Sequence, residues 1–159
     1  MKVLSIDPGF GRVGIAVLEK KNGSKEEILF SECFETSSSY NFNKRLILIG
    51  EEINKIISKF NPNAVAIEKL FFNTNQKTAI NVAQIYGMIQ YIALSNEIKF
   101  YEYTPLQVKV AITGNGRATK KDVFFILKRL VKIEKEKAID DEYDAIAVGI
   151  TFFAIEKSI

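Results

Sequence analysis

Hydrophobic residues in the first 35 positions form three short runs with the composition of β-strands. Residues 2–7, 14–20 and 26–35 are rich in β-branched and aromatic side chains, and short turns separate them. Asn22-Gly23, between the second and third runs, is a dipeptide typical of a tight hairpin turn. The pattern predicts an antiparallel meander of three strands.

Beyond residue 40 the hydrophobic period becomes that of a helix. Apolar residues recur at helical spacing from 42 to 60, and Asn61-Pro62 should end this helix. We expect further strands and helices at these ranges: strands 64–68 and 99–103, and helices 76–94, a short one after Pro105, 120–133 and 141–155.

The order of these elements predicts the sheet. A strand, a long helix and another strand form a right-handed crossover between parallel strands. The last two strands should therefore lie parallel to the first, beyond the edge opposite the meander. We expect an α/β protein with a ribonuclease-H-like mixed five-stranded sheet and helices on both faces. Ligands of open α/β sheets bind at the carboxyl ends of the strands.

Three glycines near the start of the chain imitate a dinucleotide-binding motif. Gly9, Gly11 and Gly14 have the spacing G-x-G-x-x-G. That motif requires a helix after its last glycine, because the helix N-terminus holds the pyrophosphate. Residues 14–18 are instead β-branched and apolar, so a second strand is the better interpretation.

Composition limits the fold and the chemistry. A chain of 159 residues with 47% hydrophobic content predicts one compact domain over 1–159. No histidine is present, which excludes mechanisms based on imidazole, and the single Cys33 is expected to be a buried, inert thiol. The first residues lack a signal-peptide pattern, and the longest apolar run, 146–155, is too short to cross a bilayer. We expect a cytoplasmic protein without membrane contact.

Positive charge is concentrated late in the chain. Residues 116–137 contain eight Lys or Arg residues and three Asp or Glu residues, while the whole chain has a net charge of +3. This stretch could contact phosphate groups. A solvated helix face with internal ion pairs explains the same pattern equally well.

Carboxylates occur where the predicted strands and the last helix meet. Asp7 and Glu68 end two strands that should be neighbours, and Asp141 and Asp144 share one face of the last helix. Converging carboxylates repel each other unless cations intervene. Oxygen ligands favour Mg²⁺, with Mn²⁺ as a substitute, and a pair of such ions about 4 Å apart promotes phosphodiester hydrolysis. The sequence therefore predicts a metal-dependent phosphodiester hydrolase.

Five motifs resemble those of the RuvC family of Holliday junction resolvases, in the same order along the chain. They are IDPG at 6–9, AIEKLFF at 66–72, EYTPLQVK at 102–109, GNGRATKK at 114–121 and DEYDAIA at 141–147. The resemblance implies a homodimeric, magnesium-dependent endonuclease that cuts four-way DNA junctions symmetrically in recombination and repair. It also implies a branch-migration motor as a partner.

The resemblance assigns roles to individual residues. Asp7, Glu68, Asp141 and Asp144 match the family's four catalytic, metal-binding carboxylates, with Asp140 as an alternative to Asp141. Lys109 and Lys120 resemble lysines near the scissile phosphate, and Lys120 is assigned a catalytic role as well. Phe71 matches an aromatic residue that stacks on junction bases. Arg117 and Lys121, in the basic stretch, complete the expected DNA contacts.

The predicted helix 76–94 is apolar on nearly every side. A helix that covers one sheet face needs only an apolar stripe, so its second face could pack against the same helix of another copy. Ala83 and Gly87 would allow that close approach. Complete burial inside one copy is the alternative.

Three other functions remain open at this stage. A nuclease of the same fold that processes structured RNA, similar to the YqgF family, would share the first motif. An ATP-binding domain of the actin or sugar-kinase type would share the first hairpin, although it needs a duplicated domain that 159 residues can scarcely hold. A junction-binding protein without catalytic activity is the third. The preferred cleavage sequence and the number of ions bound at rest do not follow from the sequence.

Overall fold

The computed structural model describes residues 1–70, 76–133 and 140–156. Its elements in chain order are β1 (Lys2–Asp7), β2 (Arg12–Glu19), β3 (Glu27–Glu35), α1 (Phe42–Phe60), β4 (Ala64–Glu68), α2 (Gln76–Ser95), β5 (Lys99–Tyr103), α3 (Pro105–Thr113), α4 (Lys120–Leu130) and α5 (Asp140–Ile155).

The five strands form one mixed sheet in the order β3-β2-β1-β4-β5. The first three strands pair antiparallel, β4 lies parallel to β1, and β5 lies parallel to β4. The predicted α/β fold class and strand order are therefore confirmed. Because β1 and β4 are parallel neighbours with Ile6 opposite Ile67, their carboxyl ends meet at one edge of the sheet.

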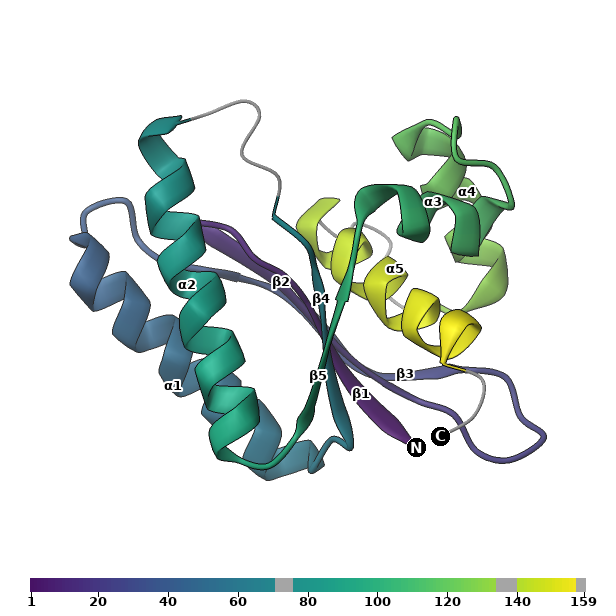
Figure 1. Cartoon of the computed structure of the whole chain (residues 1–159), viewed down its shortest axis with the longest axis horizontal. Helices are drawn as coiled ribbons and strands as arrows, with labels where there is room; N and C mark the ends of the chain where they lie inside the picture. The colour runs from purple at the N-terminus through teal and green to yellow at the C-terminus, as the bar shows by residue number, and fades with distance from the viewer. Residues whose placement is uncertain (71–75, 134–139, 157–159) are drawn as a thin grey trace.

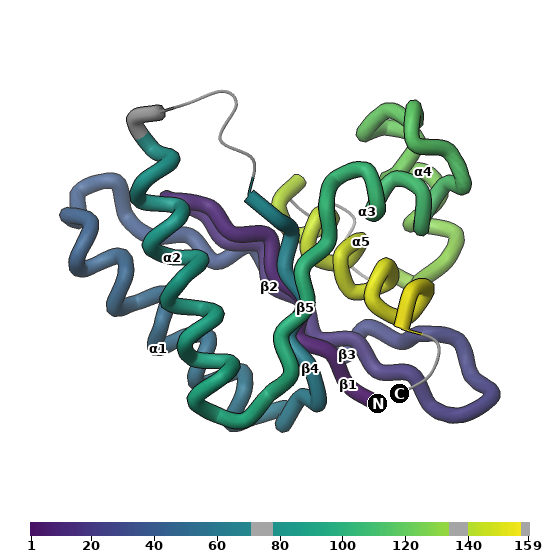
Figure 2. Tube along the Cα trace, viewed as in Figure 1, coloured from purple at the N-terminus to yellow at the C-terminus, as the bar shows by residue number. Residues whose placement is uncertain are grey.

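Helices cover both faces of the sheet. Figure 1 shows α1 and α2 side by side on one face, and α5 on the other face with α3 and α4 packed outside it. Each face has its own hydrophobic core: one is built around Ile49, Ile53 and Ile89, the other around Leu127 and Phe152. The tube in Figure 2 shows the same three-layered arrangement.

Two details differ from the expectations. Helix α4 ends at Leu130 instead of residue 133, because Val131 adopts an extended conformation with its N–H bonded to the carbonyl of Leu127. Cys33 is only partly buried, since it lies on β3 at the edge of the sheet. Burial and the nearby charge of Asp141 nevertheless raise the pKa of its thiol to about 11, which agrees with the expected inert side chain.

Candidate active site

Two carboxylates lie side by side where β1 and β4 end. Asp7 is the last residue of β1 and Glu68 is the last residue of β4. Apolar residues fill the strands before them, and Leu4, Ile6 and Ile67 are completely buried. The register of two parallel strands therefore brings these two acids to the same sheet edge.

A third carboxylate comes from the first turns of α5. This helix lies across β1 and β2 and places Asp144 beside Glu68 and Lys120. The approach of α5 depends on Gly14 of β2: a Cβ atom there would lie 1.9 Å from the carbonyl oxygen of Asp141. The last glycine of the G-x-G-x-x-G spacing therefore allows the helix to pack on the sheet. It lies within a strand and does not begin a helix, as expected.

A cavity of about 200 Å³ joins the three acids to two lysines. Its lining consists of Asp7, Glu68, Pro105, Val108, Lys109, Lys120, Val123 and Asp144. Five residues selected from the sequence thus face one cavity. A neighbouring hollow of about 310 Å³ continues from Asp7 and Glu68 along Lys69 and Leu70.

The clustering of acids changes how Asp7 ionises. Burial raises its pKa to about 8, and the charges of Glu68, Asp144 and Asp141 act in the same direction, while Lys120 opposes them. Burial also raises the pKa of Glu68 to about 7, with Asp144 adding to the effect. The acids are close enough that the loss of one proton makes the loss of the next more difficult.

Lys120 partly balances this negative charge. It is the first residue of α4, whose N-cap Thr119 is held by a capping box with Asp122. Its ammonium donates a 2.7 Å hydrogen bond to Asp144 and lies 3.9 Å from Asp140. Burial raises the pKa of Asp144, and Lys120 only partly reverses the shift. Burial lowers the pKa of Lys120, but its bond to Asp144 and the surrounding acids leave it raised overall.

The fourth predicted carboxylate, Asp141, turns toward β2 and β3. Its Oδ2 atom lies 3.2 Å from Nε of Arg12 and accepts a weak 3.8 Å contact from Cys33. Its charge still raises the pKa of Asp7, an effect that Asp140 does not have. The side chain of Asp140 is 72% exposed, so the geometry favours Asp141 as the member of the site.

The oxygen donors of the cavity suit a hard divalent cation, but their side chains are not arranged around a single point. Within the described ranges, no three His, Cys, Asp or Glu side chains are arranged around a common point in a way that could hold a metal ion. Two of the carboxylates form ion pairs with cations instead: Asp141 with Arg12 and Asp144 with Lys120. The three acids nevertheless offer only oxygen donors, which are the ligands that Mg²⁺ or Mn²⁺ prefers, and a bound dication would favour their ionised forms.

The remaining predicted DNA contacts lie outside the cavity. Arg117 is exposed in the loop between α3 and α4, where its N–H bonds to Asn115, and Lys121 is exposed on α4. Both side chains are exposed to solvent, so a large ligand can reach them. Phe71 lies outside the described residues, so its predicted stacking role stays a prediction.

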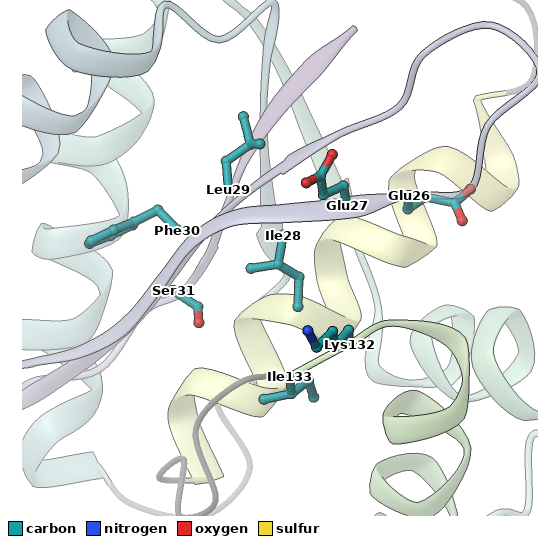
Figure 3. A pocket seen from close by; sticks show the side chains of 8 residues that line it. All are labelled: Glu26, Glu27, Ile28, Leu29, Phe30, Ser31, Lys132 and Ile133. Carbon is teal, nitrogen blue, oxygen red and sulfur yellow. The ribbon is translucent and has the colours of Figure 1, made fainter.

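A separate hollow along β3 contains none of the predicted residues. Figure 3 shows this pocket of about 300 Å³, which is lined by residues 26–31 of the β3 region together with Lys132 and Ile133. Its mixed lining has no group of acids comparable to the cavity at Asp7. The candidate site therefore remains the sheet edge at the ends of β1 and β4.

Sequence reasoning missed Arg12. Its position directly after the turn that follows Asp7 was a usable signal, because the first residue of β2 must lie close to the end of β1. What the sequence did not reveal is its partner, since Asp141 is 129 residues away along the chain.

Comparison with known proteins agrees with this geometry. The family model described as "Crossover junction endodeoxyribonuclease RuvC" matches residues 3–152. The chain belongs to the RuvC family. A RuvC of Caldicellulosiruptor saccharolyticus is 41% identical over 159 residues, which cover 100% of this chain and 96% of the relative. A RuvC of Finegoldia magna is 43% identical over 150 residues, covering 94% of this chain and 91% of the relative.

A solved structure gives the same result for the fold. Thermus thermophilus RuvC in complex with a Holliday junction substrate superposes with a TM-score of 0.87 at 29% identity, covering 95% of this chain and 92% of that chain. This protein is thus a nuclease of the RuvC family, a family of metal-dependent nucleases. None of the helices within the described ranges is long and apolar enough to span a membrane.

Proposed function

We propose that this protein resolves four-way DNA junctions by cutting two opposing strands in a magnesium-dependent reaction. The observation that carries the proposal is the convergence of Asp7, Glu68 and Asp144 with Lys120 on one cavity. Membership in the RuvC family and the relative that was solved with a Holliday junction substrate support the choice of DNA.

In this proposal the acidic residues bind metal and the lysines contact the phosphate. Asp7, Glu68, Asp141 and Asp144 would hold Mg²⁺, and their oxygen donors disfavour softer metals. When bound, a pair of such ions readies a water for attack and stabilises the leaving oxygen of the phosphodiester. Lys120, already hydrogen-bonded to Asp144, would place a positive charge beside the phosphate as negative charge develops on it.

Lys109 would act from α3, which also lines the cavity. It lies on α3, whose start is fixed by the N-cap Thr104 and Pro105 directly after β5. This rigid attachment keeps the lysine at a constant position relative to the cavity, so it can orient the substrate phosphate. Arg117 and Lys121, both exposed, would bind the DNA backbone farther out.

A cleavage assay tests the proposal. Asp7→Asn and Glu68→Gln should abolish cutting of a four-way junction in Mg²⁺ while binding of the junction persists. Glu52→Gln is the matched control, because Glu52 forms an ion pair with Lys55 on α1 and takes no part in the cavity. Unchanged cutting by the Asp7 and Glu68 variants would refute their metal-binding roles.

The substrate is tested in the same assay. Rates on a four-way junction, a linear duplex and a structured RNA should differ strongly in favour of the junction. Equal cutting of all three would contradict the resolvase assignment, and preferential cutting of the RNA would favour the processing nuclease of the same fold.

Mg²⁺ titration with thermal unfolding as readout should show metal-dependent stabilisation, and Mn²⁺ should replace Mg²⁺.

A homodimer through α2 is part of the proposal. Ile80, Tyr91 and Leu94 are 69%, 71% and 57% exposed, and their spacing puts them on one stripe of the helix. Gly87 lies on the same stripe, and a Cβ atom there would meet nothing within 4 Å. An apolar stripe interrupted by glycine suits close packing against a second copy, and a two-fold dimer suits a substrate with two opposing strands to cut. Sedimentation as a monomer at high concentration would contradict this.

Three further expectations stay predictions. They are the branch-migration motor as a partner, the cytoplasmic location, and the single-domain organisation over 1–159.

A further inference from the structure

Arg45 is a buried cation that forms no ion pair with an acid among the described residues. It lies in the first turns of α1 and is only 7% exposed. Within the described part of the chain its guanidinium donates one hydrogen bond, from Nε to the carbonyl oxygen of Tyr40 at 3.1 Å, and lies 4.7 Å from the centre of the Phe10 ring. An arginine has five N–H donors, so both terminal nitrogens remain available. A buried charge normally has a counter-charge, because desolvation is costly.

The place where this guanidinium lies is already positive. Its bond to Tyr40 folds it back onto the beginning of α1, where the helix dipole favours an anion and the Asn41 side chain caps the N–H of Lys44. The first turn of α1 contains no acidic residue, and Lys44 is exposed next to Arg45. Two independent sources of positive potential therefore meet at one point, and no acid of the described ranges forms an ion pair there.

The loop that follows Asp7 forms the other wall. Phe10 stacks on Phe42 with 6.1 Å between ring centres, and the carbonyl of Gly11 accepts hydrogen bonds from the N–H and hydroxyl of Thr36. Gly11 does not have a positive φ, so its backbone does not demand glycine. A Cβ atom on it would lie 3.4 Å from Nη1 of Arg45. A side chain at Gly11 would therefore contact this nitrogen, which glycine leaves uncrowded on that side.

The position of this cluster relates it to the candidate active site. Phe10 is three residues after Asp7, which limits the separation of their Cα atoms to about 10 Å. Figure 1 shows that α1 begins at the end of the molecule where β1 finishes, on the face of the sheet opposite α5. A DNA strand that leaves the cavity over the turn after Asp7 would pass this cluster.

We propose that Arg45 and the N-terminus of α1 bind one backbone phosphate of a junction arm, on the side of the sheet opposite α4. The inference rests on the proposed function, the binding of junction DNA. The planar guanidinium can offer two parallel N–H donors to phosphate oxygens, which a lysine cannot do. This phosphate would anchor the arm beside Asp7, and the basic residues of α4 would contact the DNA on the other side.

The first test is the salt dependence of junction binding in EDTA, where metal-dependent cutting is absent. Arg45→Met keeps an apolar stem under Phe10 but removes the charge. We expect affinity to fall about tenfold and the slope of log K against log salt to become shallower by about 1, as for one lost phosphate contact. Lys59→Met is the matched control: Lys59 is also a cation over an aromatic ring, but it lies in the last turn of α1.

The second test locates the phosphate. Single neutral methylphosphonate linkages are placed along one arm, and the affinity of the wild-type protein should fall at one position. Arg45→Met should be insensitive to that linkage and retain the wild-type response elsewhere. A variant with the wild-type slope and the wild-type response at every linkage would overturn the inference, since it would leave Arg45 with a purely structural role.

Stability and function are kept separate by two controls. If Arg45→Met does not fold, Arg45→Lys replaces it: a reduced response at the same linkage supports the bidentate contact, and the full wild-type response contradicts it. Preference of the wild-type protein for a four-way junction over linear duplex is measured in parallel. Loss of that preference would refute the proposed function, whereas its presence with an unchanged Arg45 variant would refute only this inference.

Discussion

Helices α5 and α2 are both largely apolar but have opposite surroundings. Both are apolar around nearly their whole circumference. In α5, eleven residues are buried, including the completely buried Phe152, while α2 leaves Ile80 and Tyr91 about 70% exposed. The same pattern of hydrophobic residues thus produces a core helix in one case and a surface helix in the other.

The difference arises from the layers that surround each helix. Helix α5 packs on β1 and β2 with one side and on α3 and α4 with the other, so its middle turns are covered on both sides. Helix α2 packs mainly on α1 and β5 and adds Ile85 and Ile89 to the core beneath it, and nothing within the described residues covers its outer side. A uniformly apolar helix therefore indicates two contact surfaces, and the structure decides whether both lie in the same chain.

The largest expected effect is on the chemistry that α5 carries. Asp144→Asn should lower the rate of junction cutting about a thousandfold or more, which corresponds to roughly 4 kcal/mol of transition-state stabilisation. The first-order rate with saturating protein measures this. Ile80→Ser on α2 lies away from the cavity and should leave metal-dependent thermal stabilisation intact. A cutting rate within tenfold of wild type for Asp144→Asn would remove α5 from the catalytic site.

The second effect concerns burial of aromatic residues. Phe152→Ala should lower the free energy of unfolding by about 3–5 kcal/mol, because Phe152 is completely buried against Tyr101 and Phe153. Tyr91→Ala on α2 should change it by less than about 0.5 kcal/mol when urea unfolding is measured on dilute, monomeric protein. Equal losses would mean that the outer side of α2 is covered within one copy.

The third effect compares a glycine near each helix. Gly14→Ala should cost about 2–3 kcal/mol, because the new Cβ would collide with the carbonyl of Asp141 and push the first turn of α5 away from β2. Gly87→Ala has open space around it and should stabilise the monomer by up to about 1 kcal/mol through helix propensity. The same change should weaken self-association, measured by sedimentation. A Gly14 variant as stable as wild type would contradict the close packing.

The smallest effect is the pH dependence of metal-free stability. In the folded protein the pKa of Asp7 is about 8, against 3.8 in its unperturbed state, so folding favours its protonated form. This contribution is complete below about pH 4 and is lost as the pH rises to about 8. Asp7→Asn should therefore become more stable than wild type by about 2 kcal/mol at pH 8.5 in EDTA, and by much less at pH 5.

Urea unfolding at the two pH values measures this difference, and Mg²⁺ should reduce it by stabilising the ionised wild-type site. Helix α2 contains no Asp or Glu, so a Tyr91→Ala variant should retain the wild-type pH dependence. A constant difference between wild type and Asp7→Asn across pH would show that folding does not raise the pKa of Asp7.

Much of the fold followed from local patterns. The strands, the strand order and the meeting of Asp7 with Glu68 could be predicted, because strand period, turn residues and crossover handedness restrict the sheet to few arrangements. The same reasoning placed Asp144 and Lys120 at one site only through matching motifs, since their contact joins residues 24 positions apart on different helices.

The sequence by itself determined which segments form strands and helices, and which residue types end them, because those properties depend on near neighbours. Only the tertiary structure decided that α5 is enclosed while α2 is not, that Arg12 holds Asp141, and that Arg45 lies buried without an acid beside Phe10. These depend on which distant surfaces pack together and how closely, and neither hydrophobic period nor charge along the chain contains that information.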